Sequence, residues 1–110
     1  MQRNITLYGD YFSDFYVKQT DKVKDKIDYV LDLIKNEERV PKKFLKFLTD
    51  SDGLYEIKVS TAFSSIRIFC FFDDGRLIVL TNCFIKKTQK TPKKELRLAI
   101  KLKNEYLKKK

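Results

Sequence analysis

The spacing of apolar residues in the N-terminal third changes from a strand period to a helix period. Apolar side chains alternate around Ile5 and Leu7, which predicts a strand over residues 2–8 that Gly9 ends. A short aromatic cluster at helical spacing comes next, with Asp10 or Ser13 in the capping position. A longer amphipathic helix follows it. Its apolar stripe consists of Val23, Ile27, Val30, Leu31 and Ile34.

The second half of the chain alternates between apolar strands and turn signals. Pro41 interrupts the helical pattern, and residues 44–48 form a short apolar patch before the turn cluster at 49–53. Strands are predicted over residues 54–59, 65–72 and 77–85. The last two are almost wholly apolar, as expected for central strands that are covered on both faces. A final helix is predicted with Thr91 as N-cap and Pro92 in the first turn. Its apolar stripe consists of Leu96, Ala99, Ile100 and Leu107.

An Asp-Gly pair at residues 74–75 predicts a two-residue hairpin loop between the last two strands. With this loop, Arg67 is expected to lie opposite Asn82, and Cys70 opposite Val79. Cys83 then shares a face with Cys70 but stands four residues away, about 14 Å along the ladder. A disulfide needs Cα atoms within about 7 Å. The pairing therefore predicts two reduced, buried thiols.

The composition fits one compact domain over residues 1–110. At 110 residues and 43% hydrophobic content, the chain can bury about two thirds of its unfolded surface. It has no low-complexity tract and no internal repeat. No window approaches eighteen apolar residues and the N-terminus has no apolar signal region, so a cytoplasmic protein is expected.

The net charge of +9 is confined to the last quarter of the chain. Residues 1–85 carry 13 basic and 13 acidic side chains, whereas residues 86–110 carry 11 and 2. Such segregation favours a polyanionic or acidic partner at one surface, although a solvated lysine-rich helix would show the same composition. The chain has no histidine, which excludes Cys/His metal sites and Ser-His-Asp or Cys-His catalysis. No metal or cofactor is expected.

Two cations interrupt the predicted strands. Lys58 shares a strand face with Glu56, away from the side chains assigned to the core, and could be an ordinary exposed lysine. Arg67 stands in an otherwise uncharged apolar strand, where it must reach solvent or be paired, for example with Glu56. The connecting loop allows Arg67 to lie opposite either Ile57 or Lys58. Only the second pairing places both cations on one face.

Four separated sequence signatures resemble the RelE/HigB superfamily of bacterial toxins, especially its phage-associated HigB-like branch. In order, they are GLYEIK at 53–58, the IR pair at 66–67, DDG at 73–75 and the KKTQKTP..E segment at 86–95. The resemblance covers the C-terminal half closely and the N-terminal half only in its order of elements. It implies an α+β fold, a RelE-like antiparallel sheet with two N-terminal helices packed on one face and a C-terminal basic helix. It also implies that the 44–48 patch lies under the sheet.

The resemblance further implies a type II toxin that acts as a metal-independent, ribosome-dependent mRNA endonuclease and is silenced by an antitoxin of helix-turn-helix type. Its expected partners are therefore this antitoxin, the ribosome and mRNA. Lys58, Arg67 and Lys87 match the positions expected for catalysis, with Arg67 stabilising the phosphate. Family members often carry an arginine and a tyrosine or histidine after the last strand, whereas this chain has lysines there. The proton-transferring group is thus not fixed by the resemblance. Residues expected to contact nucleic acid are Lys86, Lys90, Lys93 and Lys94.

Two other functions fit the same sequence. One is a ParE-like toxin on this fold that inhibits DNA gyrase, because fold alone does not determine activity. The other is a non-catalytic nucleic-acid-binding protein, whose lysines would supply salt-sensitive phosphate contacts. RNA cleavage requires Lys58 and Arg67 on one cleft face, whereas the two alternatives do not.

Overall fold

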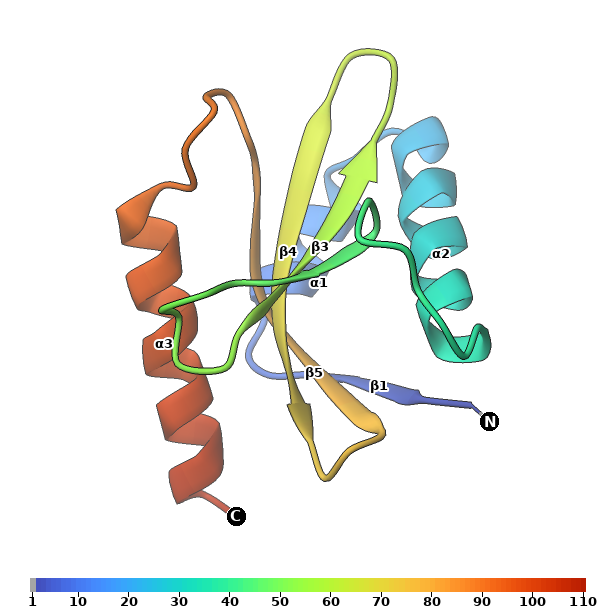
Figure 1. Ribbon diagram of the computed structural model, residues 1–110. Helices are drawn as coiled ribbons and strands as arrows, with labels where there is room; N and C mark the ends of the chain where they lie inside the picture. Colours follow the sequence, from blue (N-terminus) through green and yellow to red (C-terminus); the bar gives the residue numbers. More distant parts are fainter. Residues whose placement is uncertain (1) are drawn as a thin grey trace.

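The computed structural model describes residues 2–110, which form a five-stranded sheet between two layers of helices (Figure 1). The sheet order is β1-β5-β4-β3-β2, with β1 parallel to β5 and the other neighbours antiparallel. The elements in chain order are β1 Asn4–Leu7, α1 Tyr11–Val17, α2 Asp21–Asn36, β2 Leu45–Phe47, β3 Tyr55–Ser60, β4 Ser65–Asp73, β5 Leu77–Ile85 and α3 Lys93–Lys108. The predicted α+β fold is confirmed.

Two hydrophobic cores lie on opposite faces of this sheet. In the first core, Ile27 and Val30 of α2 pack against strand residues that include Ile57 and Ile68. The second core packs Ala99 of α3 against strand residues on the other face. Those strand residues are Leu54, Phe69, Phe71, Val79 and Phe84. Covering both faces explains why β4 and β5 are apolar along almost their whole length.

Polar contacts at both ends of α2 explain where this helix begins and stops. At the start, the Thr20 side chain accepts a hydrogen bond from the backbone N–H of Val23 at 3.3 Å. At the other end, the Arg3 guanidinium donates to the carbonyl oxygens of Ile34, Glu37 and Glu38 at 2.6–2.8 Å. A cation at this position satisfies carbonyl groups that the helix leaves without partners.

The 44–48 patch does not lie under the sheet, contrary to expectation. Its residues Leu45–Phe47 form the edge strand β2, paired with β3. The backbone of β3 requires this neighbour: the N–H of Lys58, for example, donates to the carbonyl of Phe44 at 2.8 Å. Only Phe44 and Leu45 reach the first core, whereas Phe47 remains 49% exposed.

The hairpin between β4 and β5 has a different register from the predicted one. Asp73 pairs with Leu77, so the loop contains three residues, of which Asp74 and Gly75 have positive φ angles of 60° and 76°. Farther along, Cys70 pairs with Leu80 and Ile68 pairs with Cys83, which leaves a bulge on β5. The predicted pairing is therefore wrong by one residue near the loop and by two beyond the bulge.

Two expectations about side-chain positions on these strands change as a result. Arg67 lies opposite Phe84 rather than Asn82. Cys83 lies opposite Ile68, only two positions along β4 from Cys70, rather than four residues away. Both thiols are free, as predicted, but only Cys70 is fully buried.

The C-terminal helix α3 begins one residue later than predicted. Pro92 is its N-cap, without a side-chain capping bond, and Thr91 lies outside the helix. Ala99 faces the sheet as expected, with Leu96 and Ile100 partly buried beside it. At the far end Tyr106, instead of the 44%-exposed Leu107, packs on the second core. None of the helices in residues 2–110 has the length and apolar character needed to cross a membrane.

Candidate nucleic-acid cleavage site

Lys58 and Arg67 lie directly opposite each other in the antiparallel pair of β3 and β4. This is the pairing that places both cations on one face, and opposed residues have Cβ atoms about 4.5–5.5 Å apart. The face is the one that α3 covers, because Glu56 and Phe84 stand on the same side and Phe84 belongs to the second core. The sheet therefore brings these two predicted site residues together.

The Arg67 guanidinium is held by partners on two of its three nitrogens. Its Nε lies 3.4 Å from Oε1 of Glu56, and its Nη1 donates to Ser65 Oγ at 2.8 Å and to the Ile66 carbonyl at 3.1 Å. The side chains of Arg67 and Glu56 are 12% and 3% exposed. Among the described residues, Nη2 has no hydrogen-bond partner and is not enclosed. The guanidinium is thus oriented with one nitrogen left to bind a ligand.

Three buried polar atoms in this region lack hydrogen-bond partners within residues 2–110: Glu56 Oε2, Arg67 Nε and Asn82 Oδ1. The 3.4 Å contact between Arg67 Nε and Glu56 Oε1 is therefore an ion pair without a hydrogen bond. Glu56 pairs with Phe69 across the sheet, and Asn82 belongs to the bulge beside Phe69. An unsatisfied buried polar atom costs about 1–3 kcal/mol. These atoms are free to accept or donate further hydrogen bonds to a ligand or to water.

A polar pocket of about 390 Å³ opens beside Arg67. Its lining residues are Ser65, Arg67, Lys86, Lys87, Thr88 and Gln89. The backbone N–H of Lys86 donates to the Ser65 carbonyl at 2.7 Å, which ties the segment after β5 to the start of β4. Three cations therefore surround one polar space, an arrangement suited to a phosphate group.

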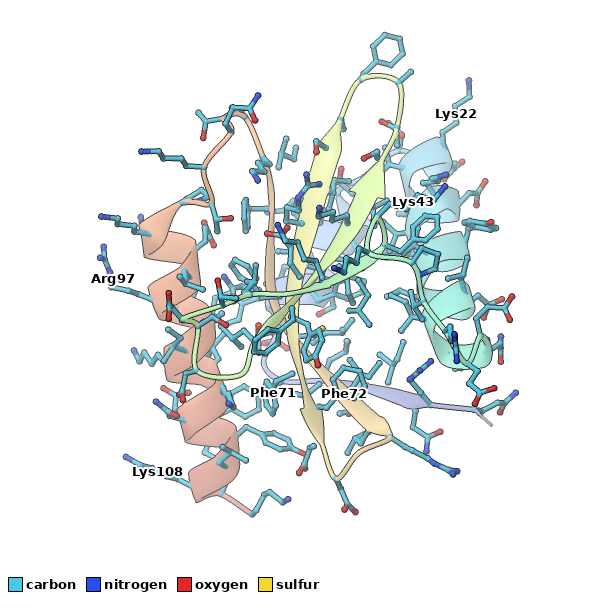
Figure 2. The ribbon with its side chains drawn as sticks, viewed as in Figure 1. Lys22, Lys43, Phe71, Phe72, Arg97 and Lys108 are labelled. Carbon is cyan, nitrogen blue, oxygen red and sulfur yellow. The ribbon has the colours of Figure 1, made fainter. Side chains whose placement is uncertain are left out.

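The other predicted site residues lie outside this pocket. Lys58 does not line it but stands next to Arg67 across the sheet. Lys90 is exposed in the segment before α3, and Lys93 and Lys94 are exposed in the first turn of α3. More distant cations such as Arg97 and Lys108 project from α3 into solvent (Figure 2).

Sequence reasoning missed two residues that shape this site. Ser65 stands two positions before Arg67 on the same strand face, so the strand period could have identified it. Asn82 reaches α3 through the bulge, where its Nδ2 donates to the carbonyl and the side chain of Glu95, both at 3.0 Å. Nothing in the residue pattern of β5 indicates a bulge at this position.

The site contains no cluster of metal ligands. Within residues 2–110, no three His, Cys, Asp or Glu side chains are placed to hold a metal ion. The groups available for chemistry are therefore lysine amines, the arginine guanidinium, hydroxyls and the buried Glu56 carboxylate. Such groups can bind a phosphate, stabilise developing negative charge and move protons.

Comparison with known proteins gives one family. A model of the family described as "Phage derived protein Gp49-like (DUF891)" matches residues 14–104, which includes every helix and strand except β1 in whole or in large part. A search among curated proteins gives no match. The match spans the Lys58–Arg67 pair and the pocket as well as most of α3. The chain therefore belongs to the Gp49-like family of phage-derived proteins, which is part of the RelE/HigB-like toxin group.

Proposed function

We propose that this protein is a HigB-like toxin of a type II toxin–antitoxin system and that it cleaves mRNA on the ribosome. The observation that carries this proposal is the convergence of Arg67, Lys86 and Lys87 on one polar pocket, with Lys58 directly opposite Arg67. Membership of the RelE/HigB-like group supports the toxin function. The geometry supports cleavage, because a passive phosphate contact does not require an arginine that is fixed by a buried carboxylate.

The proposed reaction is attack of an RNA 2′-hydroxyl on the adjacent phosphate. A bond forms between the 2′ oxygen and phosphorus, the bond from phosphorus to the 5′ oxygen breaks, and a 2′,3′-cyclic phosphate results. Arg67 binds the phosphate through Nη2 and stabilises the negative charge that develops there. Arginine does not give up its proton in proteins, so the lysines must transfer protons. The Lys58 amine accepts the proton of the 2′-hydroxyl, and the Lys87 ammonium donates one to the 5′ oxygen.

The remaining cations contribute binding rather than chemistry. Lys86 lies in the pocket, and Lys90, Lys93 and Lys94 continue the positive surface toward α3. Contacts of this kind supply salt-dependent affinity for phosphates with little sequence information. The same surface is suited to an acidic segment of an antitoxin, which would silence the toxin by covering the pocket.

The proposal is tested by comparing the wild-type protein with Arg67→Ala in a translating bacterial extract. The 5′ ends of a reporter mRNA are mapped with and without ribosomes. Wild type should produce ribosome-dependent cuts at codon positions, and Arg67→Ala should cut about 100-fold more slowly or not at all. Arg97→Ala is the matched control, because it removes an arginine that projects from α3 into solvent.

Two results would contradict the proposal. Intact mRNA with unaffected translation in the presence of wild-type protein would exclude mRNA cleavage. Equal cutting by wild type and Arg67→Ala would show that the pocket is not the cleavage site. A gyrase supercoiling assay on the same preparations would then test the ParE-like activity.

A further inference from the structure

Phe63 is 99% exposed, at the turn between β3 and β4. The other exposed large apolar side chains in residues 2–110 range from 43% to 65%. Full exposure of an aromatic ring to water is unfavourable by the hydrophobic effect, and no neighbouring side chain shields it. The other residues of the turn are small: Thr61, Ala62 and Ser64.

The turn that carries Phe63 is braced by hydrogen bonds from both of its sides. The N–H of Thr61 donates to the Ser64 carbonyl at 2.9 Å. The N–H groups of Phe63 and Ser64 donate to Thr61 Oγ1 at 3.3 and 3.0 Å. A turn that is ordered in this way presents the ring without a large entropy cost when a ligand binds.

This turn also stands at the same end of the sheet as the candidate cleavage site. It joins the strands that carry Lys58 and Arg67. Ser65, two residues after Phe63, lines the pocket and accepts the hydrogen bond from Lys86. In Figure 1 the β3–β4 turn and the segment between β5 and α3 both extend from the top of the sheet. Phe63 precedes Arg67 by four positions, and β4 begins only at Ser65, so their Cα atoms are at most about 14 Å apart.

We propose that Phe63 is a stacking platform for a base of single-stranded RNA whose neighbouring phosphate occupies the Arg67 pocket. This inference rests on the proposed function and names a binding subsite for its substrate. Proteins bind single-stranded nucleic acids by combining a cationic groove with aromatic side chains on which bases stack. Because Phe63 stands in the hairpin turn, four positions from Arg67, the ring would contact a flanking nucleotide rather than the one that is cleaved.

A nucleobase fits this ring better than an apolar protein groove or a membrane does. Both of those would bury a contiguous apolar patch. The turn instead offers the hydroxyls of Thr61 and Ser64, and the pocket that begins at Ser65 offers the amines of Lys86 and Lys87. Bases and phosphates alternate along an RNA strand. The Phe63 ring can stack on a base, and the cationic pocket can bind a phosphate.

The test uses single-stranded RNA oligonucleotides with 2′-O-methyl sugars, which cannot be cleaved, and with 2-aminopurine at successive positions. Fluorescence of 2-aminopurine falls when the base stacks on an aromatic ring. Wild type and Phe63→Tyr should quench the fluorescence at one position, whereas Phe63→Leu should not. Phe63→Leu should also weaken binding about fivefold to 150-fold, the range found for loss of one base–aromatic stack.

Tyr29→Leu is the matched control, because Tyr29 is also exposed, at 55%, but belongs to α2 on the other face of the sheet. It should bind and quench like wild type. Unfolding in urea should be the same for all Phe63 variants, since the ring is almost completely exposed. This measurement separates loss of stacking from loss of fold.

The outcomes separate this inference from the proposed function. Equal affinity and equal quenching for wild type and Phe63→Leu would overturn the stacking platform, even if wild type still cuts mRNA in the extract. A second readout is the rate of ribosome-dependent cutting, which Phe63→Leu should lower at limiting ribosome concentration and Phe63→Tyr should preserve. A wild-type rate in Phe63→Leu would overturn the inference. Absence of cutting by wild type would overturn the proposed function. The fluorescence assay uses RNA that cannot be cleaved, so it would still test the stacking platform.

Discussion

Lys58 and Arg67 are like charges in directly opposed positions of β3 and β4. Such a pair destabilises an antiparallel sheet. The structure offsets this by placing the carboxylate of Glu56 3.4 Å from Arg67 Nε, on the same face. Two opposed cations that cost stability and need a neighbouring carboxylate are expected where a protein binds an anion.

We expect Lys58→Ala and Arg67→Ala each to lower the rate of mRNA cutting by about 100-fold or more, because each removes a group that acts on the reacting phosphate. The double variant should be little slower than the slower single variant, because residues that act as a unit are not additive. Rates of ribosome-dependent cutting measure both effects. Lys22→Ala, on the outer surface of α2, is the control and should cut at the wild-type rate. Multiplicative losses in the double variant would show that the two cations act independently.

Removing only Glu56 should destabilise the protein more than removing both Glu56 and Arg67. Glu56→Leu leaves the Arg67 charge largely buried without its carboxylate and should lower the free energy of unfolding by about 3 kcal/mol. Glu56→Leu combined with Arg67→Met should recover part of this loss, because no charge then remains uncompensated. Urea denaturation at neutral pH measures both values. A double variant less stable than Glu56→Leu alone would contradict this account.

Much of the fold follows from patterns that do not depend on distant contacts. The almost wholly apolar runs of β4 and β5 predict central strands, and their bounds agree with the structure to within one residue. The stripe of α2 likewise matches the buried residues Ile27, Val30 and Ile34. Strand periodicity also places Lys58 and Glu56 on one face, and Arg67 lies on that face as well. The expectation that this face points away from the core is wrong, because α3 covers it and Leu54 and Glu56 are buried there.

The features that could not be predicted depend on pairing between strands. The bulge near Asn82 is fixed by tertiary contacts: Thr81 Oγ1 donates to the Phe69 carbonyl at 3.1 Å, and Asn82 reaches Glu95 on α3. A short apolar patch does not reveal whether it pairs as an edge strand, which explains the error at β2. The pocket itself requires the bond between Lys86 and Ser65, two residues far apart in the sequence.

Lys93 and Lys94 should contribute to RNA affinity without affecting chemistry. They are exposed in the first turn of α3, where cations are unfavourable for the helix dipole, and they lie outside the Arg67 pocket. Replacing both with Gln should weaken binding of single-stranded RNA. It should also reduce the slope of log affinity against log salt by about 0.7 for each phosphate that the variant no longer neutralises. The position of mRNA cuts should not change. An unchanged salt slope would show that neither lysine binds phosphate.

Acid should weaken the attachment of the C-terminal end of α3 to the sheet. Asp73 accepts hydrogen bonds from Lys110 Nζ and Tyr106 Oη, both at 2.7 Å, and these bonds hold the pKa of Asp73 below its ordinary value. A lowered pKa means that the contribution to stability is present above the ordinary aspartate pKa of about 3.9 and is lost as the pH falls further. Lys110→Met should raise the pKa of Asp73 in an NMR titration and reduce this acid-dependent loss. Lys108→Met is the control, and an unchanged Asp73 pKa in Lys110→Met would contradict the assignment.

The two thiols should be inert in the folded protein at pH 8. Burial raises the pKa of Cys70, and burial together with the nearby Glu95 carboxylate raises the pKa of Cys83 to about 12. Because the thiolate is the reactive form, a raised pKa leaves almost none of it at pH 8. A chromogenic disulfide reagent should therefore label neither cysteine in native protein and both in urea. Ser60→Cys supplies an exposed thiol at the end of β3 as the control and should react in the native state. Rapid labelling of Cys83 in native wild-type protein would show that the region beside the bulge opens more readily than its packing implies.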